Sequence, residues 1–569
     1  MSVPRLTGTS TGTPSEPTEP SGCIYYPNEV YASSPVWLVV VTNVTASVHI
    51  RTDNNNDREL TADDDLVKTN QAFRFWINND HDVPTVDFPN GEDKPWGNDS
   101  SDKEISSIRD LEDFAQMEID VDASTLDLIQ NYGYKVALVS TGPQVNVFPA
   151  YQPGDAHLTD TNVANHQARG GEVQECSYGS SSFDCFVPTE PSPPCSIAQD
   201  LNNLTITNLQ NYFLFEGKSA GTGVFRVEVR NPIGMAVTND TAKIEIKDIK
   251  DLYERVEAII DTTIPNTTPG SWMPLGPSVA SFPRDSTNAI VFVHGWNNDD
   301  WYKSLRGEIL VKRLYWQGFD GKIVGFRWPT YAGAIALVRY NHSEYRAFKS
   351  GQSLAEFLMG SSSLTGYKIN MLSHSMGNIV AGEALRRLPA GVVSYAVFTQ
   401  AAVPAHCYDT RDELNYADFM NIEVNQPTPD SYRGRFSEID QKLLAKAANF
   451  YNPVDYALTI WWRGNQIANK PTPPFYFMDG DTPKCGWTTF GRIVTQPYEL
   501  MSMVSRPRSH ALAVEGRTGE TGVGPVIPGL NLQESLGFDQ TEPDHSGQFN
   551  RPYQQVWKYY QKLLQEYDR

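Results

Sequence analysis

A serine occupies residue 375 in the string Ser-His-Ser-Met-Gly at residues 373–377, after an apolar run and before a segment with helical spacing. The run 367–373 reads as a strand, so the string predicts a sharp strand-to-helix turn. Such a turn strains the backbone of its serine and lifts the hydroxyl clear of the sheet, where it can attack a carbonyl carbon. Small residues are needed two positions before and after the serine. Gly377 meets this demand, and Ser373 occupies the position where glycine is usual. The alternative interpretation of residues 373–377 is an ordinary polar turn without a catalytic serine.

Acyl transfer also requires two backbone N–H groups aimed at the carbonyl oxygen, because negative charge develops there. We expect one from Met376, at the start of a helix whose dipole favours negative charge. The other is expected from Trp296, in the loop after the apolar strand at 289–294, since Gly295 lets that backbone bend inward. His294 ends the strand and is expected to fix this loop; a role as the catalytic base is the alternative.

Three segments together resemble the α/β-hydrolase superfamily: Val291–Trp296 (VFVHGW), Gly325–Pro329 (GFRWP) and Leu372–Gly377 (LSHSMG). They look most like a bacterial group of lipase-like and esterase-like proteins with a His-Gly-Trp oxyanion loop. The resemblance covers roughly residues 285–569 and implies an α/β fold, a serine mechanism and the chain order serine, acid, histidine. It leaves the substrate open.

This order directs the search for the acid and the base. Asp455 follows an apolar run expected to form a strand and would orient and stabilise an imidazolium; a helix N-cap is the alternative. His545 precedes an amphipathic helix expected over 552–567, where the superfamily carries its base, and His510 is the other candidate. His545 would take the proton from Ser375 and return it to the leaving group.

The elements that must position these residues begin beyond residue 285, where strands and helices alternate as in a largely parallel sheet covered on both faces. We expect an α/β-hydrolase catalytic domain over 250–569. Before it we expect a flexible leader over 1–30, a β-rich accessory domain over 31–185 and a small sandwich-like domain over 196–248.

Two long insertions interrupt the expected catalytic domain, at roughly 404–441 and 472–544. Loops of this length are usually functional or disordered, and both fall where a lid or substrate cleft would form. Trp461, Trp462 and the aromatic run 475–477 could line an apolar acyl pocket or simply belong to the core.

An acidic stretch lies in the expected accessory domain. Asp53, Asn55, Asp57 and Asp64 stand at positions one, three, five and twelve of a loop, the spacing that wraps a calcium ion. Position six, where the turn favours glycine, is Arg58, and a plain solvated acidic turn is the alternative. Such calcium would be structural, since the serine mechanism requires no cofactor.

Composition restricts the partners. The chain has 569 residues with 46 positive and 68 negative side chains, a net charge of −22, which disfavours nucleic acid and anionic membranes. We find no run near the roughly 20 apolar residues of a membrane span. The amino terminus lacks the apolar stretch of a secretory signal, but a trimmed leader would look the same, so secretion or a cell-surface location stays open.

Six cysteines occur, and none has the spacing of a zinc site or a redox pair. Cys176, Cys185 and Cys195 cluster, so one local disulfide is expected in an oxidising compartment, with free thiols as the alternative.

We therefore expect a serine hydrolase that cleaves a small-molecule or polymeric carboxylic ester through an acyl-enzyme. Two alternatives stay open: a catalytically silent binding module with the same fold, and an amide or thioester hydrolase using the same residues. The intact serine, acid and histidine candidates favour an enzyme.

Overall fold

The computed structural model describes residues 45–77, 79–81, 111–149, 199–260, 270–332, 340–403, 405–408, 435–455, 457, 527–538, 541, 542, 544–551 and 553–568, with short strands at 176–177, 184–185, 476–479 and 482–485. The expected leader over 1–30 lies outside these residues. None of the helices in this described part is long and apolar enough to cross a membrane.

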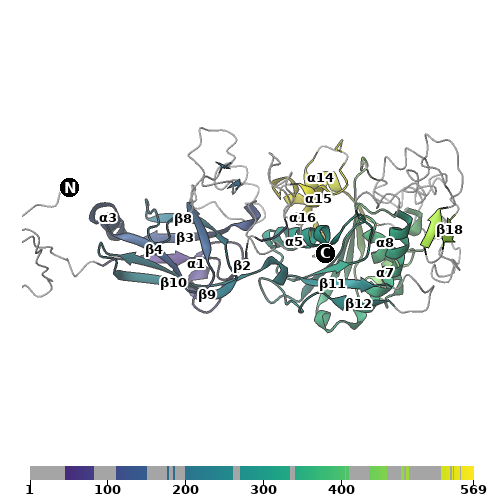
Figure 1. Ribbon diagram of the computed structural model, residues 1–569, viewed down its shortest axis with the longest axis horizontal. Helices are drawn as coiled ribbons and strands as arrows, with labels where there is room; N and C mark the ends of the chain where they lie inside the picture. The colour runs from purple at the N-terminus through teal and green to yellow at the C-terminus, as the bar shows by residue number, and fades with distance from the viewer. Residues whose placement is uncertain are drawn as a thin grey trace, which may run out of the picture.

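Two four-stranded sheets form the N-terminal part of the molecule (Figure 1). Apolar residues of both sheets share one buried cluster, because each strand alternates inward apolar with outward polar side chains. The first sheet has the order β1 (Val48–Arg51), β3 (Ala115–Val121), β8 (Gln210–Gly217), β5 (Val145–Pro149). The second has the order β2 (Phe73–Trp76), β10 (Ala236–Lys247), β9 (Gly221–Arg230), β4 (Lys135–Ser140).

The segments expected as separate domains over 31–185 and 196–248 are joined in this structure. Strand β8 pairs with both β3 and β5, β9 pairs with β4, and β10 pairs with β2. The expected boundary therefore does not separate two folding units. The physical reason is that the strands of the second segment fill the middle of both sheets, so that neither segment completes a sheet alone.

An eight-stranded sheet forms the C-terminal part, and its strands are parallel except for the edge strand β12. The expectation of a mostly parallel sheet is confirmed. In spatial order the strands are β12 (Ser271–Pro274), β11 (Glu254–Ile259), β14 (Lys322–Arg327), β13 (Asn288–Val293), β15 (Lys368–His374), β16 (Tyr395–Thr399), β17 (Ala447–Tyr451) and β20 (Gly529–Asn531).

Helices cover both faces of this sheet. Ile290 and Phe292 of β13 are buried with α5 (Asp300–Trp316) and α16 (Tyr553–Tyr567). Val291 and Val293 are buried on the other face with α7 (Tyr340–Gly360) and α8 (Gly377–Arg387). Successive side chains of a strand point to opposite faces, so the continuous apolar run of β13 is explained by burial on both sides. Shorter helices are α1 (Ala62–Val67), α3 (Ala123–Tyr132), α9 (Ile439–Lys442), α14 (Leu532–Leu536) and α15 (Gly547–Asn550).

The two parts of the molecule meet at the end of α5 (Figure 1). Trp76 of β2 stacks on Phe75 with ring centroids 3.9 Å apart, and its edge meets Tyr315 of α5 at 4.9 Å. Phe75 also packs edge-on against Trp316. These aromatic rings join the N-terminal sheets to the helix layer of the large sheet in one apolar cluster.

Buried charges lie beside this aromatic contact. The ammonium group of Lys312 on α5 is 2.6 Å from an Asp80 carboxylate oxygen and 3.1 Å from one of Asp113. Arg313 pairs with Glu112 at 3.0 Å. All five side chains are almost fully buried. Because buried charges are tolerated only when they are paired, these contacts fix how the two parts meet.

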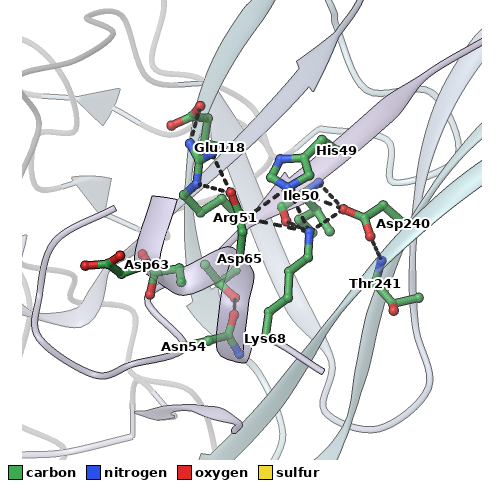
Figure 2. A network of polar contacts seen from close by, with 12 residues as sticks. His49, Ile50, Arg51, Asn54, Asp63, Asp65, Lys68, Glu118, Asp240 and Thr241 are labelled. Carbon is green, nitrogen blue, oxygen red and sulfur yellow. Dashed lines mark hydrogen bonds and ion pairs between the residues drawn. The ribbon is translucent and has the colours of Figure 1, made fainter. Parts of the chain in front are cut away.

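A second polar network ties α1 to the strands around it (Figure 2). The Asp65 carboxylate accepts from Arg51 on β1 at 2.8 Å and lies 2.9 Å from the His49 ring. Lys68, just after α1, donates to Asp240 on β10. Burial and the adjacent Lys68 ammonium lower the pKa of His49. The acidic loop that precedes α1 is thus anchored through this helix to both N-terminal sheets.

Replacing Lys312 by methionine should destabilise the chain by about 3–5 kcal/mol, because it leaves two buried carboxylates without their cation. Denaturant unfolding of the full chain measures the change. Lys247→Met is the matched control: Lys247 is 40% exposed and pairs with Glu245, so its loss should cost less than about 1 kcal/mol. Equal effects of the two variants would contradict this account of the interface.

Candidate active site

Ser375 occupies a left-handed turn between β15 and α8. Strand β15 ends at His374, Ser375 has a φ of 54°, and α8 begins at Gly377. The Ser375 N–H donates to the Thr399 carbonyl at 3.0 Å, and the Ser375 carbonyl accepts from Ala402 N–H at 3.1 Å. A non-glycine residue with this φ is strained and persists only where its surroundings hold it. The sharp turn expected from the sequence is present.

Two glycines allow the loops around Ser375 to approach closely. A Cβ added to Gly377 would lie 2.4 Å from the His294 carbonyl oxygen, so any larger residue would push α8 away from β13. A Cβ on Gly295 would lie 2.9 Å from the Ser375 Cβ. The loop that carries Trp296 therefore runs directly against the nucleophile candidate.

Ser373, at the position where glycine is usual, is accommodated and forms a hydrogen bond. Its hydroxyl donates to the Asn378 side-chain oxygen at 2.7 Å, and Asn378 Nδ2 donates to the Ser375 carbonyl at 2.9 Å. Both Ser373 and Asn378 are fully buried. This pair braces the strained turn from inside, and the sequence reasoning missed Asn378, which is an ordinary position in a helical pattern.

His545 lies between Ser375 and Asp455. His545 Nε2 is 2.8 Å from Ser375 Oγ, and His545 Nδ1 is 2.6 Å from Asp455 Oδ2. A carboxylate only accepts, so the ring proton resides on Nδ1, and Nε2 is left to accept from the serine hydroxyl. The structure thus brings together the three residues that the sequence singled out, from the ends of β15 and β17 and the loop before α15.

Asp455 makes both contacts that the sequence left as alternatives. Its Oδ1 accepts from Ala457 N–H at 3.0 Å, as a cap would, while Oδ2 faces His545. The side chain is fully buried. The other histidine candidate, His510, lies outside the described residues.

His294 is engaged with backbone groups on both ring nitrogens. Nε2 accepts from Trp328 N–H at 3.1 Å, so Nδ1 carries the proton and donates to the Gly295 carbonyl at 2.8 Å. The ring also stacks on Trp328 with an interplanar angle of 7°. Burial lowers the pKa of His294 well below its ordinary value, so the ring is neutral. These contacts hold the loop in place beside Ser375.

Met376 is the N-cap residue of α8 and is buried. Its N–H precedes the first intrahelical hydrogen bonds, and such groups are available to an anion at a helix start. The use of the Met376 and Trp296 N–H groups as an oxyanion hole stays a prediction.

Ser375 is more enclosed than the sequence predicts, with 7% of its surface exposed. Most of the two expected lid insertions lies outside the described residues, as do Trp461, Trp462 and Phe475. Tyr476 and Phe477 belong to the short strand β18 (Tyr476–Asp479), whose side chains are not described. The predicted acyl pocket stays a prediction.

Side chains that the sequence reasoning missed hold the loop that carries His545. The Asp544 carbonyl accepts from Gln400 Nε2 at 2.7 Å and from Asn452 Nδ2 at 2.6 Å. The His545 carbonyl accepts from His374 Nε2 at 2.9 Å. Burial and the neighbouring His545 lower the pKa of His374 well below its ordinary value, so it donates as a neutral ring. His374 is the last residue of β15, and Gln400 and Asn452 directly follow β16 and β17, which are adjacent parallel strands. A polar residue at the carboxyl end of a predicted strand is therefore the sequence feature that could have identified them.

The acidic loop is arranged largely by its own hydrogen bonds. Asp53 accepts from Asp57 N–H and Arg58 N–H, both at 2.8 Å, and Asp64 accepts from Asn55 N–H at 3.1 Å. Among the residues that the structure describes, no three His, Cys, Asp or Glu side chains form a group suited to a metal ion. The calcium site stays a prediction.

Arg58, at position six of this loop, adopts the backbone conformation that usually favours glycine. Its φ is 71°, the left-handed conformation expected there. Its guanidinium lies 5.0 Å from the Tyr315 ring centroid and donates to the Phe319 carbonyl at 2.9 Å. These contacts hold the Arg58 side chain against the C-terminal part of the chain.

The short strands β6 (Cys176–Ser177) and β7 (Asp184–Cys185) pair so that Cys176 lies opposite Cys185. Their side chains are not described, so the expected local disulfide stays a prediction.

A mostly parallel sheet covered on both faces, with a serine on a strained turn between strand and helix, is the α/β-hydrolase fold. The C-terminal part of the chain is therefore an α/β-hydrolase domain. Residues 280–397 match the family described as alpha/beta hydrolase of unknown function (DUF900). The matched stretch contains the His294–Trp296 loop and Ser375, whereas Asp455 and His545 follow it.

Solved structures add only a distant likeness. An acylaminoacyl peptidase of Pyrococcus horikoshii is 10% identical with a TM-score of 0.27, over 62% of this chain and 48% of that one. A family 123 glycoside hydrolase from Clostridium perfringens is 8% identical with a TM-score of 0.13, over 74% of this chain and 77% of that one. Both scores are too low to carry an argument about activity. No curated protein matches the chain in sequence.

Calcium should raise the melting temperature of the chelator-treated chain more at pH 8 than at pH 5. Burial and the neighbouring Asp64 and Asp57 raise the pKa of Asp53 to about 7, and burial raises that of Asp64 to about 6. The folded state therefore retains protons that the unfolded chain releases near pH 4, so stability from these groups falls as pH rises from about 4 to about 7. A cation on the ionised carboxylates would offset this loss.

Differential scanning fluorimetry with calcium or magnesium measures the effect. Asp53→Asn should abolish the response, and Asp63→Asn, at an exposed position of α1 outside the predicted ligand set, should keep it. An identical response in both variants would contradict the predicted site.

Proposed function

We propose that this protein is a serine hydrolase that cleaves carboxylic esters through an acyl-enzyme on Ser375. One observation carries the proposal: the continuous hydrogen-bond chain from Ser375 Oγ through both nitrogens of His545 to Asp455 Oδ2, with distances of 2.8 and 2.6 Å. A serine hydroxyl is a weak nucleophile, and a base at this distance, itself oriented by a carboxylate, is the arrangement that activates it.

In the proposed reaction, His545 Nε2 removes the hydroxyl proton while Ser375 Oγ attacks the ester carbonyl carbon. The resulting oxyanion would be bound by the N–H groups of Trp296 and Met376. The imidazolium, stabilised by Asp455, then returns the proton to the departing alkoxide, which leaves an acyl group on Ser375. Water, deprotonated by the same nitrogen, releases the carboxylic acid and restores the serine.

The choice of an ester rests on the resemblance of the His-Gly-Trp loop to that of esterase-like and lipase-like proteins. Amide and thioester cleavage use the same three residues, so substrate panels must separate them.

The alternative of a catalytically silent module has one observation in its favour, the 7% exposure of Ser375. The complete hydrogen-bond chain from Ser375 to Asp455 argues against a silent module, because it would activate the serine once a substrate could reach it. Labelling by a fluorophosphonate probe discriminates the two readings, since only an activated and reachable serine reacts.

Ser375→Ala should lower kcat on short p-nitrophenyl esters by about 10⁴-fold or more and abolish fluorophosphonate labelling, with an unchanged circular dichroism spectrum. Ser124→Ala, at an exposed site near the start of α3, serves as the control and should retain both activities. Equal turnover by the Ser375 variant and the parent chain would reject the proposed nucleophile.

His545→Ala should lower kcat by about 10³–10⁴-fold, because Ser375 loses its general base. His510→Ala, which removes the other histidine considered from the sequence, should leave kcat within about twofold of the parent. Steady-state kinetics on the same ester compares them. A large loss in the His510 variant with full activity in the His545 variant would reverse the assignment.

A further inference from the structure

Gln400 lies between the carboxylate and the loop that carries the imidazole. It follows β16 directly and is fully buried. Its Nε2 donates to Asp455 Oδ2 at 3.2 Å and to the Asp544 carbonyl oxygen at 2.7 Å. The carboxylate oxygen that accepts from Gln400 is the same one that faces His545 Nδ1. One amide group therefore contacts both the partner of His545 and the backbone next to it.

The backbone of Gln400 is held in an unusual conformation to reach this place. Its φ is 44°, in the left-handed region that residues with side chains rarely adopt. Its N–H donates to the Phe450 carbonyl of β17 at 2.8 Å. Thr399, directly before Gln400, and Ala402, two residues after it, hold the Ser375 backbone through the Thr399 carbonyl and the Ala402 N–H. Strain of this kind persists where the surrounding structure requires the residue, which is common at functional sites.

The orientation of the amide is determined by its neighbours. Both groups that face it, a carboxylate and a carbonyl, are acceptors, so Gln400 must present its NH₂ group to them. Its Oε1 is buried and has no hydrogen-bond partner among the residues that the structure describes. A buried carbonyl without a partner is unfavourable, so the fold tolerates a cost to keep the donor facing Asp455.

We propose that Gln400 is a positioning residue that sets the proton affinity of His545 by donating to Asp455 Oδ2; this rests on the hydrolase function proposed above. A hydrogen bond to the carboxylate spreads its negative charge and weakens its pull on the Nδ1 proton. Without Gln400 the carboxylate would stabilise the imidazolium more strongly, and His545 would act as a free base only at higher pH.

Asn452 provides a matched comparison within the same fold. It is also fully buried, and its Nδ2 donates to the same Asp544 carbonyl at 2.6 Å. Its Oδ1 accepts from Val454 N–H at 3.1 Å. Within the described residues, the Asn452 side chain makes no hydrogen bond to the Asp455 carboxylate. Removing the Asn452 amide disturbs the anchor of the histidine loop and the Val454 N–H in the turn before Asp455. Removing the Gln400 amide disturbs the same anchor and also takes a donor from the Asp455 carboxylate itself.

The test compares Gln400→Met with Asn452→Leu, both close in shape to the parent residue. Gln400→Met should move the acidic limb of the kcat/KM pH profile upward by about half to one pH unit and lower kcat about tenfold, with KM within about twofold. Asn452→Leu should lower kcat without moving the limb.

A second readout separates this proposal from the proposed function. The downfield proton resonance of the His545 Nδ1 hydrogen bond, assigned by its loss in His545→Ala, can be followed by NMR in the full chain without any substrate. It should shift in Gln400→Met and stay in Asn452→Leu. Absence of both ester turnover and fluorophosphonate labelling in the parent chain would defeat the proposed function, while this resonance would still test Gln400. Identical resonances and pH profiles in the Gln400 and Asn452 variants would overturn the positioning role.

Discussion

The left-handed backbone at Ser375 is the constraint on which the rest of the site depends. Ser375 follows β15 with a φ of 54°. Its hydroxyl lies within hydrogen-bond distance of the imidazole of His545, which is 170 residues later in the chain. This conformation is unfavourable for a residue with a Cβ, so it must be held by its surroundings. Thr399, Ala402 and Asn378 bond the Ser375 backbone. The site is thus a strained turn stabilised by its neighbours.

The parallel sheet brings the other residues of the candidate site to this strained turn. Strands β15, β16 and β17 are adjacent, and their carboxyl ends lie at one edge. His374, Gln400 and Asn452 occur at those ends, and all three donate to the carbonyls of residues 544 and 545. The loop that carries His545 lies 170 residues after Ser375 in the chain. It is therefore held by the same strand ends that position Ser375. Rigid strands make this placement more exact than a mobile loop could.

The N-terminal sheets are attached to this domain by contacts that favour a fixed arrangement. Aromatic rings of β2 and α5 share one apolar cluster, and the Lys312 ammonium lies between two buried carboxylates. Arg58 adds a contact from the acidic loop to the Phe319 carbonyl. An interface that buries charges in pairs resists sliding, because displacement would leave those charges unpaired. The N-terminal part thus packs against α5, which in turn covers one face of the large sheet.

The sequence by itself predicted the class of the C-terminal fold and the candidate residues of its site, because the strand-turn-helix segment is local and the resemblance to the superfamily implies the order of the other two residues. An apolar strand, a small-residue turn and a following helix can be read from consecutive residues around Ser375, and His545 is placed by the terminal helix after it. Only the tertiary structure decided that the two N-terminal segments share their sheets, that Gln400 and Asn452 hold the histidine loop, and that Asp455 both caps a turn and faces the imidazole. These contacts join residues far apart in the chain, and strand pairing and side-chain hydrogen bonds at such separations leave no periodic signal in one sequence.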